Sequence, residues 1–185
     1  IGYVYYTSGN YEDALQSYNE ALQIQRNSKH SMNNTCSMLH LAATLNCLGV
    51  LHFHTSEVDS SKPMRYFIDS LSIYRSIHSL DCENREIATI LNNIGRVHYK
   101  NGDNEKALEI YSQVLSIRRR ILGDDHIDVA ASAYNAGQTY QGVGELENAL
   151  QLYNEFLRIA EKHLGLAHRD VAIVLKCTAQ IHHQK

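Results

Sequence analysis

Histidine, a residue type that can bind a metal, is frequent in this chain, but its spacing does not favour a metal site. The chain has eleven histidines; His52 and His54 lie two residues apart, and His182 and His183 are adjacent. Two zinc ligands on one helix favour a spacing of i and i+4. Packing between helices is therefore the favoured role for His52, His98 and His182. We expect no bound metal.

The carboxylates of Asp124, Asp125 and Asp128 form a second cluster that could carry chemistry. They lie beside a predicted helix start, where the helix dipole stabilises negative charge. General acid–base catalysis also needs a cleft, and the sequence has no nucleophile motif and no phosphate-binding glycine loop. We therefore expect no enzyme and no cofactor. His126 and His168, which follow two similar linkers, are expected to help begin the next helix.

The elements that carry these residues repeat along the chain. Pairs of identical residues stand 42 positions apart: Gly95 and Gly137, Ala107 and Ala149, Tyr111 and Tyr153. A period of about 20 to 50 residues is typical of a stacked array, in which each unit buries its apolar face against its neighbours. Such an array offers a long surface for another chain rather than a closed catalytic pocket.

Apolar periodicity predicts two helices in each repeat and no strand. The predicted helices cover residues 1–8, 11–27, 37–55, 62–79, 84–101, 103–122, 126–142, 145–164 and 168–184. Gly102 is expected to end one helix in a left-handed conformation, and Asp103 to cap the next. Short turns make paired helices antiparallel. We predict an all-α array over residues 1–185, with about three full repeats and a half repeat at each end.

Small residues and tyrosines mark the predicted helix contacts. Small residues recur at Gly2, Gly49, Gly95, Gly137 and Ala179, where neighbouring helices can approach closely. Tyrosines at Tyr18, Tyr111 and Tyr153 are expected in the core. Asn10 and Asp13 resemble a capping pair. Longer turns are expected at 27–34 and 55–63, with Pro63 in the first turn of its helix.

Both ends of the chain carry half repeats. Their apolar faces would be exposed without further repeats: Val4 and Tyr5 at one end, and Val171, Val174, Leu175 and Ile181 at the other. The chain begins with Ile1 in mid-pattern, so we take it as a piece of a longer protein.

Charge and cysteine use narrow the class of partner. The net charge of −3 gives no field that would attract nucleic acid. The basic run 118–120 lies late in a predicted helix and is expected to be solvated there. The four cysteines show no C-x-x-C spacing, which fits a reducing cytoplasm. We expect no membrane span, no signal peptide and no nucleic-acid partner.

One motif points to a known family. The pattern G-x6-G-x4-A-L-x2-Y, formed by Gly95, Gly102, Ala107, Leu108 and Tyr111, resembles a tetratricopeptide repeat. The 42-residue period and the linker L-G-x-x-H-x-x-V-A, present at 122–130 and 164–172, resemble the kinesin light chain type. This resemblance implies a right-handed superhelix of antiparallel helix pairs, an α-solenoid. The first helices of the pairs would line an inner groove that binds peptide segments of partner proteins.

By position, the resemblance also implies a set of groove residues. These are Asn46, Asn92, Asn93, Arg96, Tyr99, Lys100, Tyr134, Asn135, Gln138, Gln141 and Lys176. An asparagine amide can both donate to and accept from a peptide backbone, and Arg96 with Lys100 favours acidic partner segments. In the alternative, Asn92 and Asn93 only form hydrogen bonds between adjacent helices.

These expectations combine into a protein–protein interaction scaffold, a kinesin light chain-like adaptor that binds partner peptides. Two alternatives remain open. The array could be a structural spacer or self-association module, because half repeats expose apolar surface at both ends. It could also be the regulatory arm of an enzyme that lies outside this segment.

Overall fold

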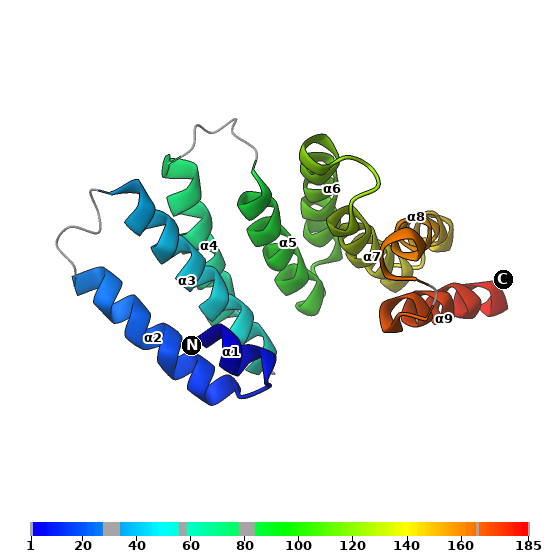
Figure 1. Ribbon diagram of the computed structural model, residues 1–185. Coiled ribbons are helices and arrows are strands. Elements are labelled where there is room, and N and C mark those ends of the chain that lie inside the picture. Colours follow the sequence, from blue (N-terminus) through cyan, green and yellow to red (C-terminus); the bar gives the residue numbers. More distant parts are fainter. Residues whose placement is uncertain (1, 28–33, 56–58, 78–83, 166, 185) are drawn as a thin grey trace. The chain divides into compact units, whose positions relative to one another are not determined.

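The computed structural model describes residues 2–27, 34–55, 59–77, 84–165 and 167–184, and these residues form helices and no strand (Figure 1). The helices are α1 (Gly2–Thr7), α2 (Tyr11–Asn27), α3 (Thr35–Thr55), α4 (Ser61–Ile77), α5 (Arg85–Lys100), α6 (Asn104–Leu122), α7 (Ile127–Gly142), α8 (Leu146–Leu164) and α9 (Arg169–Gln184). The all-α prediction is confirmed, and helix ends differ from the predicted ones by about two residues. The predicted longer turns at 27–34 and 55–63 lie largely outside the described residues.

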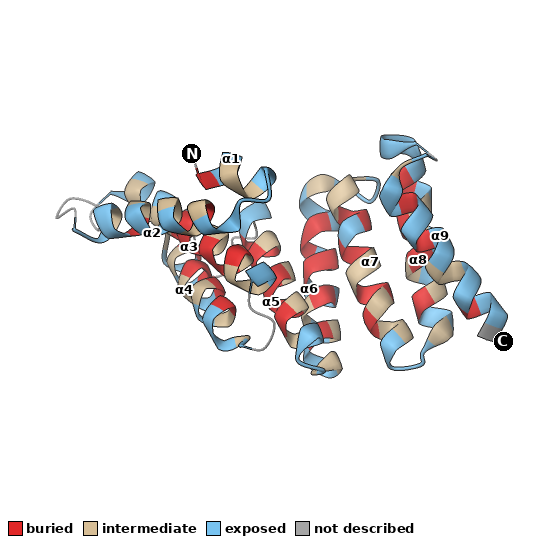
Figure 2. Ribbon diagram, turned by 90° about the horizontal axis from the view of Figure 1, so that it is seen from below, coloured by how far each residue is buried: buried red, intermediate tan, exposed pale blue. Residues whose placement is uncertain are grey.

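The chain divides into two compact units, residues 1–97 and 98–185. In the first unit α2 packs against α1 and α3, and α3 packs against α4. In the second, α7 packs against α6 and α8, and α8 packs against α9. Figure 2 shows buried stripes along α6 to α8 and mostly exposed residues along α9. The single array over residues 1–185 stays a prediction.

Glycines end five segments in the left-handed backbone region. The residues are Gly9, Gly102, Gly123, Gly144 and Gly165, with φ between 79° and 84°. Side chains other than glycine rarely adopt this conformation, which explains why glycine recurs at the turns. The predicted helix end at Gly102 is thus confirmed.

Two predicted helix caps had different outcomes. The Asp13 N–H donates to Asn10 Oδ1 at 3.5 Å, as the capping pattern predicted. The prediction for Asp103 was wrong, because its side chain makes no cap hydrogen bond with α6. Its carboxylate instead lies 2.8 Å from Lys106 Nζ and 3.4 Å from His98 Nδ1. The ammonium of Lys106 thus holds the carboxylate that the backbone N–H groups would otherwise bind.

Close helix approach is confirmed at three glycines on first helices, which are Gly2, Gly49 and Gly137. A Cβ at Gly2 would lie 2.9 Å from Tyr18 Cε2. A Cβ at Gly49 would lie 2.5 Å from Phe67 Cε1, and one at Gly137 would lie 2.8 Å from Tyr153 Cε1. Real Cβ atoms do not approach that closely, so the aromatic ring of the second helix needs glycine opposite it. Tyr153 and Tyr111 are fully buried, as predicted.

Three sequence predictions about exposure were wrong. Arg118 is buried, and its Nη1 donates to Asp128 O at 2.8 Å and to Ser132 Oγ at 2.7 Å. A buried guanidinium is stable when its donors are paired in this way. His182, predicted to pack between helices, is exposed. At the two ends of the chain, Val4 and Leu175 are exposed as expected, but Val171, Val174 and Ile181 are buried in the core of the second unit.

Helix α3 is long and apolar enough to cross a membrane by length and composition, which the sequence analysis did not predict. It contains no charged Asp, Glu, Lys or Arg residue. In the structure it packs between α2 and α4, and residues such as Leu45, Leu48 and Leu51 are buried. Its apolar character therefore serves the core of the first unit.

Candidate functional site

The predicted groove residues fall in both units. Asn46, Asn92, Asn93 and Arg96 belong to the first unit, and the remaining seven belong to the second. All of these residues lie on the first helices of the pairs, which are α3, α5, α7 and α9.

In the first unit the amide of Asn93 binds another predicted residue. Its Nδ2 donates to Asn46 Oδ1 at 3.1 Å and so joins α5 to α3. Asn93 is only 7% exposed, whereas Asn46 and Asn92 are half-buried. The inter-helix hydrogen bond that the alternative interpretation expected is therefore present for Asn93. Asn46 keeps its Nδ2 donors for other contacts, because its oxygen is the group that Asn93 binds.

Arg96 is held in place by an aromatic side chain. Its guanidinium carbon lies 4.6 Å from the centre of the Phe53 ring, so α5 and α3 are also joined by a cation–π contact. Both side chains are half-buried. Stacking restricts the position of the guanidinium. The Arg96 side chain therefore loses less conformational entropy when a ligand binds to it.

Two hollows open beside Asn46. The larger, which we call the asparagine hollow, has a volume of about 340 Å³. It lies between α3, α4 and α5 and is lined by Ala43, Asn46, Cys47, Tyr74, Arg85, Glu86, Thr89 and Ile90. The smaller, which we call the tyrosine hollow, has a volume of about 170 Å³. It lies between α1, α2 and α3 and is lined by Tyr3, Tyr6, Tyr18, Asn46, Cys47, Val50 and Leu51.

Asn46 and Cys47 form a wall common to both hollows. Burial raises the pKa of the Cys47 thiol, an effect that a hydrogen bond with Tyr18 partly offsets. Burial also raises the pKa of Tyr18, and Cys47 adds to that shift. Both groups are therefore neutral at physiological pH, and the wall presents a neutral surface to a ligand.

In the second unit, most predicted residues on α7 bind each other or the core. Tyr134 lies against two rings, with centroids 6.1 Å from Tyr153 and 5.9 Å from Phe156. Gln138 Nε2 donates to the Tyr134 hydroxyl at 2.8 Å, and the Tyr153 hydroxyl donates to Gln141 Oε1 at 2.8 Å. Asn135 is half-buried on the same helix, while Tyr99, Lys100 and Lys176 are exposed.

A third hollow lies between α7, α8 and α9, at the repeat position of the asparagine hollow. It has a volume of about 50 Å³ and is lined by Tyr134, Phe156, Asp170, Ile173 and Val174. Tyr134 stands three residues before Gly137, just as Asn46 stands three before Gly49. The tyrosine ring thus occupies space that the asparagine leaves open.

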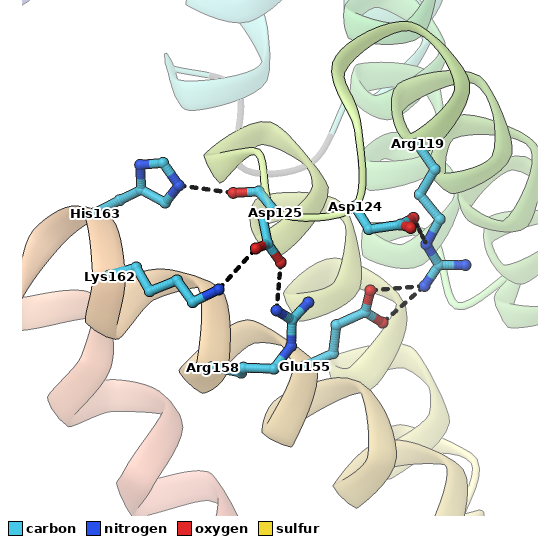
Figure 3. Close-up of polar contacts among 7 residues, drawn as sticks. All are labelled: Arg119, Asp124, Asp125, Glu155, Arg158, Lys162 and His163. Carbon is cyan, nitrogen blue, oxygen red and sulfur yellow. Dashed lines mark hydrogen bonds and ion pairs between the residues drawn. The ribbon is translucent and has the colours of Figure 1, made fainter.

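A charged cluster on the second unit was missed at the sequence level (Figure 3). The Asp125 carboxylate accepts from Lys162 Nζ at 2.7 Å and from Arg158 Nη1, and its backbone oxygen lies 2.7 Å from His163 Nε2. Lys162 and Arg158 lower the pKa of Asp125 to about 2, chiefly through their hydrogen bonds to its carboxylate.

A neighbouring arginine completes this cluster. Arg119 Nη2 donates to both carboxylate oxygens of Glu155, at 2.7 and 2.8 Å. Its Nε lies 3.8 Å from Asp124 Oδ1. The partners on α8 stand 33 to 38 positions from the acid or arginine that they bind, so periodicity alone did not connect them. The exposed pairs fix the α6–α7 linker on α8 and are not arranged for catalysis.

Three histidines contact backbone or aromatic groups. His126 Nδ1 accepts from the Asp128 N–H at 3.1 Å, and His168 Nδ1 accepts from the Asp170 N–H at 3.2 Å. The predicted role of both residues at helix starts is confirmed. His52 stacks on Tyr66 at 5.4 Å, and burial lowers its pKa. Within the described residues, no three His, Cys, Asp or Glu side chains group to hold a metal ion.

Comparison with known families identifies the repeat. A family model of the tetratricopeptide repeat matches residues 86–162, and a second model of the same description matches residues 1–28. Together these stretches cover more than half of the 185 residues. The chain therefore belongs to the tetratricopeptide repeat family, whose fold is generally a non-catalytic scaffold for protein–protein interaction.

Solved structures share this fold. BtubC (BKLC) from P. vanneervenii matches with a TM-score of 0.74 and 18% identity, over 94% of this chain and 66% of that one. The nearly identical TPR-like repeats of a kinesin light chain-type protein of Podosopora anserina match with a TM-score of 0.73 and 20% identity, over 100% of this chain and 84% of that one. This chain thus spans slightly less than two thirds of BtubC. No curated protein sequence matches it. The predicted resemblance to kinesin light chain-type repeats is confirmed at the level of the fold.

Proposed function

We propose that this chain is an adaptor that binds a short segment of a partner protein on the first-helix face of its first unit. The observation that carries the proposal is the pair of hollows beside Asn46, which open from the faces of α1, α3 and α5. A segment that crosses α3 at the shared wall would place one side chain in each hollow. The tyrosine hollow has mainly apolar walls and suits an apolar side chain.

Polar groups near the wall supply contacts to the backbone of such a segment. The Nδ2 of Asn46 takes no part in the hydrogen bond with Asn93, so it can donate to a partner carbonyl. Arg96, ordered on Phe53, adds positive charge on the same helix face as Asn93. A partner segment with acidic residues outside the two hollows fits this charge.

The likeness of the fold to kinesin light chain-type repeats supports the adaptor role. The cysteines described by the structure, Cys36, Cys47 and Cys177, are free thiols. Free thiols fit a reducing compartment, so we place this adaptor in the cytoplasm, with protein rather than nucleic acid or membrane as its partner.

Selection of peptides from a random displayed library on the immobilised chain tests the proposal. We expect selected peptides to bind the wild type, and Val50→Trp to weaken their binding about tenfold or more, because the indole fills the tyrosine hollow. The matched control is Ile24→Trp, which adds the same ring on α2 at a residue that is 71% exposed. Equal loss in both variants, or unchanged binding by Val50→Trp, would contradict the proposed site.

A second candidate function is self-association through α9. Ile173 is 36% exposed and Leu175 is 49% exposed on this helix. Light scattering of the chain, with Leu175→Lys as the variant, separates the candidates. A dimer that dissociates in the variant supports self-association, and a monomer at all concentrations excludes it.

A further inference from the structure

An acid occurs at one repeat position in three successive first helices, but its surroundings differ. The residues are Glu86, Asp128 and Asp170, which stand 42 positions apart. Asp128 lies 3.8 Å from His126 Nδ1, and Asp170 lies 3.7 Å from His168 Nδ1. All three sit in the first turn of a helix, where the dipole favours negative charge.

Glu86 has no such histidine. The residue at the position of His126 is Asn84, whose Oδ1 accepts from the Ile87 N–H at 2.7 Å. Glu86 makes no ion pair and no side-chain hydrogen bond with any residue that the structure describes. It is thus the one of these three acids with no histidine Nδ1 within 4 Å of its carboxylate in the described part of the chain.

Glu86 also faces the largest of the hollows described above. Its counterpart Asp170 borders a hollow of about 50 Å³, whereas Glu86 borders one of about 340 Å³. Tyr74 forms the inner wall, and its pKa is raised by burial and then by the nearby Glu86 carboxylate. The negative charge of Glu86 therefore reaches the interior of the hollow.

The lining holds several hydrogen-bond acceptors beside the Nδ2 group of Asn46, which can donate. The Thr89 hydroxyl donates to Arg85 O at 2.9 Å, which leaves its oxygen as an acceptor. The phenol oxygen of Tyr74 and the two oxygens of Glu86 are further acceptors. Arg85 is the other charged residue of the lining, and it already has an interaction of its own. Ala43 and Ile90 supply apolar wall between these groups.

We propose that the asparagine hollow binds a lysine side chain of the partner segment. Its ammonium lies at Glu86, and its methylenes lie against Ala43 and Ile90. Lysine combines a long apolar stem with a terminal group that has three donors and no acceptor, which matches this lining. The inference rests on the proposed function and specifies one partner residue.

The test uses a small probe, so that it does not depend on finding the partner. Nα-acetyl-lysine N-methylamide is titrated into the isotope-labelled full chain while amide resonances are followed by NMR. We expect saturable shifts at residues 43–47, 74 and 85–90. The norleucine analogue, with a similar stem and no charge, and the glutamate analogue are the comparison probes. Both are expected to bind about tenfold more weakly or not at all.

Three variants locate the effect. Glu86→Gln is expected to weaken binding of the lysine probe about tenfold, and Asn46→Tyr to abolish it by filling the hollow. Asp170→Asn, at the matching position of the second unit, should leave the affinity unchanged. Equal shifts with the glutamate probe, or full affinity in Glu86→Gln, would overturn the lysine assignment. If selected peptides still bound the wild type and lost affinity in Val50→Trp, the proposed function would remain supported without the lysine assignment.

Discussion

The two hollows at matching repeat positions differ about sevenfold in volume, although the helices around them follow the same pattern. In the first unit the position three residues before the close-packed glycine is Asn46, and in the second it is Tyr134. Phe67 packs on the glycine of the first unit and Tyr153 on that of the second. Three residues after these rings stand Ser70 and Phe156, respectively. Two side chains thus decide whether the space between three helices stays open or joins the core.

The neighbouring face shows the same contrast in polarity. Gly2 on α1 is followed by Tyr3, and Gly137 on α7 is followed by Gln138. Three positions further along are Tyr6 and Gln141. In the second unit Gln141 accepts from the Tyr153 hydroxyl, whereas in the first unit the two tyrosines border an apolar hollow. The repeat therefore conserves the helix contacts, and its two units differ in the surface around them.

The largest expected effect comes from removing the ring that closes the smaller hollow. Phe156 is 5% exposed and packs in the main core of the second unit. Phe156→Ala is expected to cost about 3–5 kcal/mol in the free energy of unfolding. Ser70→Ala, at the matching position, should cost only about 1 kcal/mol, because it loses one hydrogen bond to Ala42 O. Urea denaturation followed by circular dichroism measures both, and equal losses would contradict the comparison.

The glycines that face these rings give a smaller expected effect. Gly49→Ala places a Cβ 2.5 Å from Phe67, and Gly137→Ala places one 2.8 Å from Tyr153. Overpacking lowers the free energy of unfolding by about 1–3 kcal/mol. The higher helix propensity of alanine offsets this loss by up to about 1 kcal/mol. We expect a lower thermal midpoint for both, and a larger loss for Gly49→Ala. Gly142→Ala is the control, because its Cβ would lie 3.9 Å from the nearest neighbouring atom, on Tyr99.

The two units use different residue types to cap their helices. Removing one of these caps is expected to change the free energy of unfolding by a still smaller amount. In the first unit Asn84 caps α5 and Asn34 caps α3 through side-chain oxygens. In the second unit His126 caps α7 through Nδ1. His126→Ala is expected to cost about 0.5–1 kcal/mol, and His126→Asn should restore most of it, because asparagine provides the same acceptor. Thermal unfolding of both variants checks this, and an equally destabilised asparagine variant would count against the cap.

The smallest expected effect lies in the α6–α7 linker. Asp125 there corresponds to Ala167 in the α8–α9 linker. The pKa of Asp125 is about 2, below its ordinary value of 3.8, so its contribution to stability is present above about pH 4 and is lost as the pH falls toward 2. Asp125→Ala should therefore lower the thermal midpoint at pH 6 and leave it unchanged near pH 2. Asp124→Ala, whose carboxylate is 79% exposed, should show little change at either pH.

Periodic features of the fold could be predicted from the sequence. The glycine turns, the buried Tyr111 and Tyr153 and the close contact at Gly137 all follow from residues that recur at one spacing. Each of these features depends on a residue and its near neighbours within one repeat. For this reason the helix boundaries were also nearly correct.

Features that depend on distant partners could not be predicted in the same way. The buried Arg118 depends on acceptors across a turn, and the bonds of Asp125 depend on residues of α8. The hollows follow from the combined volume of side chains on three helices, which no spacing reveals. The hydrogen bond from Asn93 to Asn46 was expected as an alternative, and the structure adds which atom of Asn46 is left to donate.

The wall of Asn46 and Cys47 separates the two hollows of the first unit and borders both. A bulky group bound in one hollow would contact the same two residues that line the other hollow. If the proposed segment binds there, we expect the two partner side chains to be selected as a pair, so that a change in one alters the preference for the other.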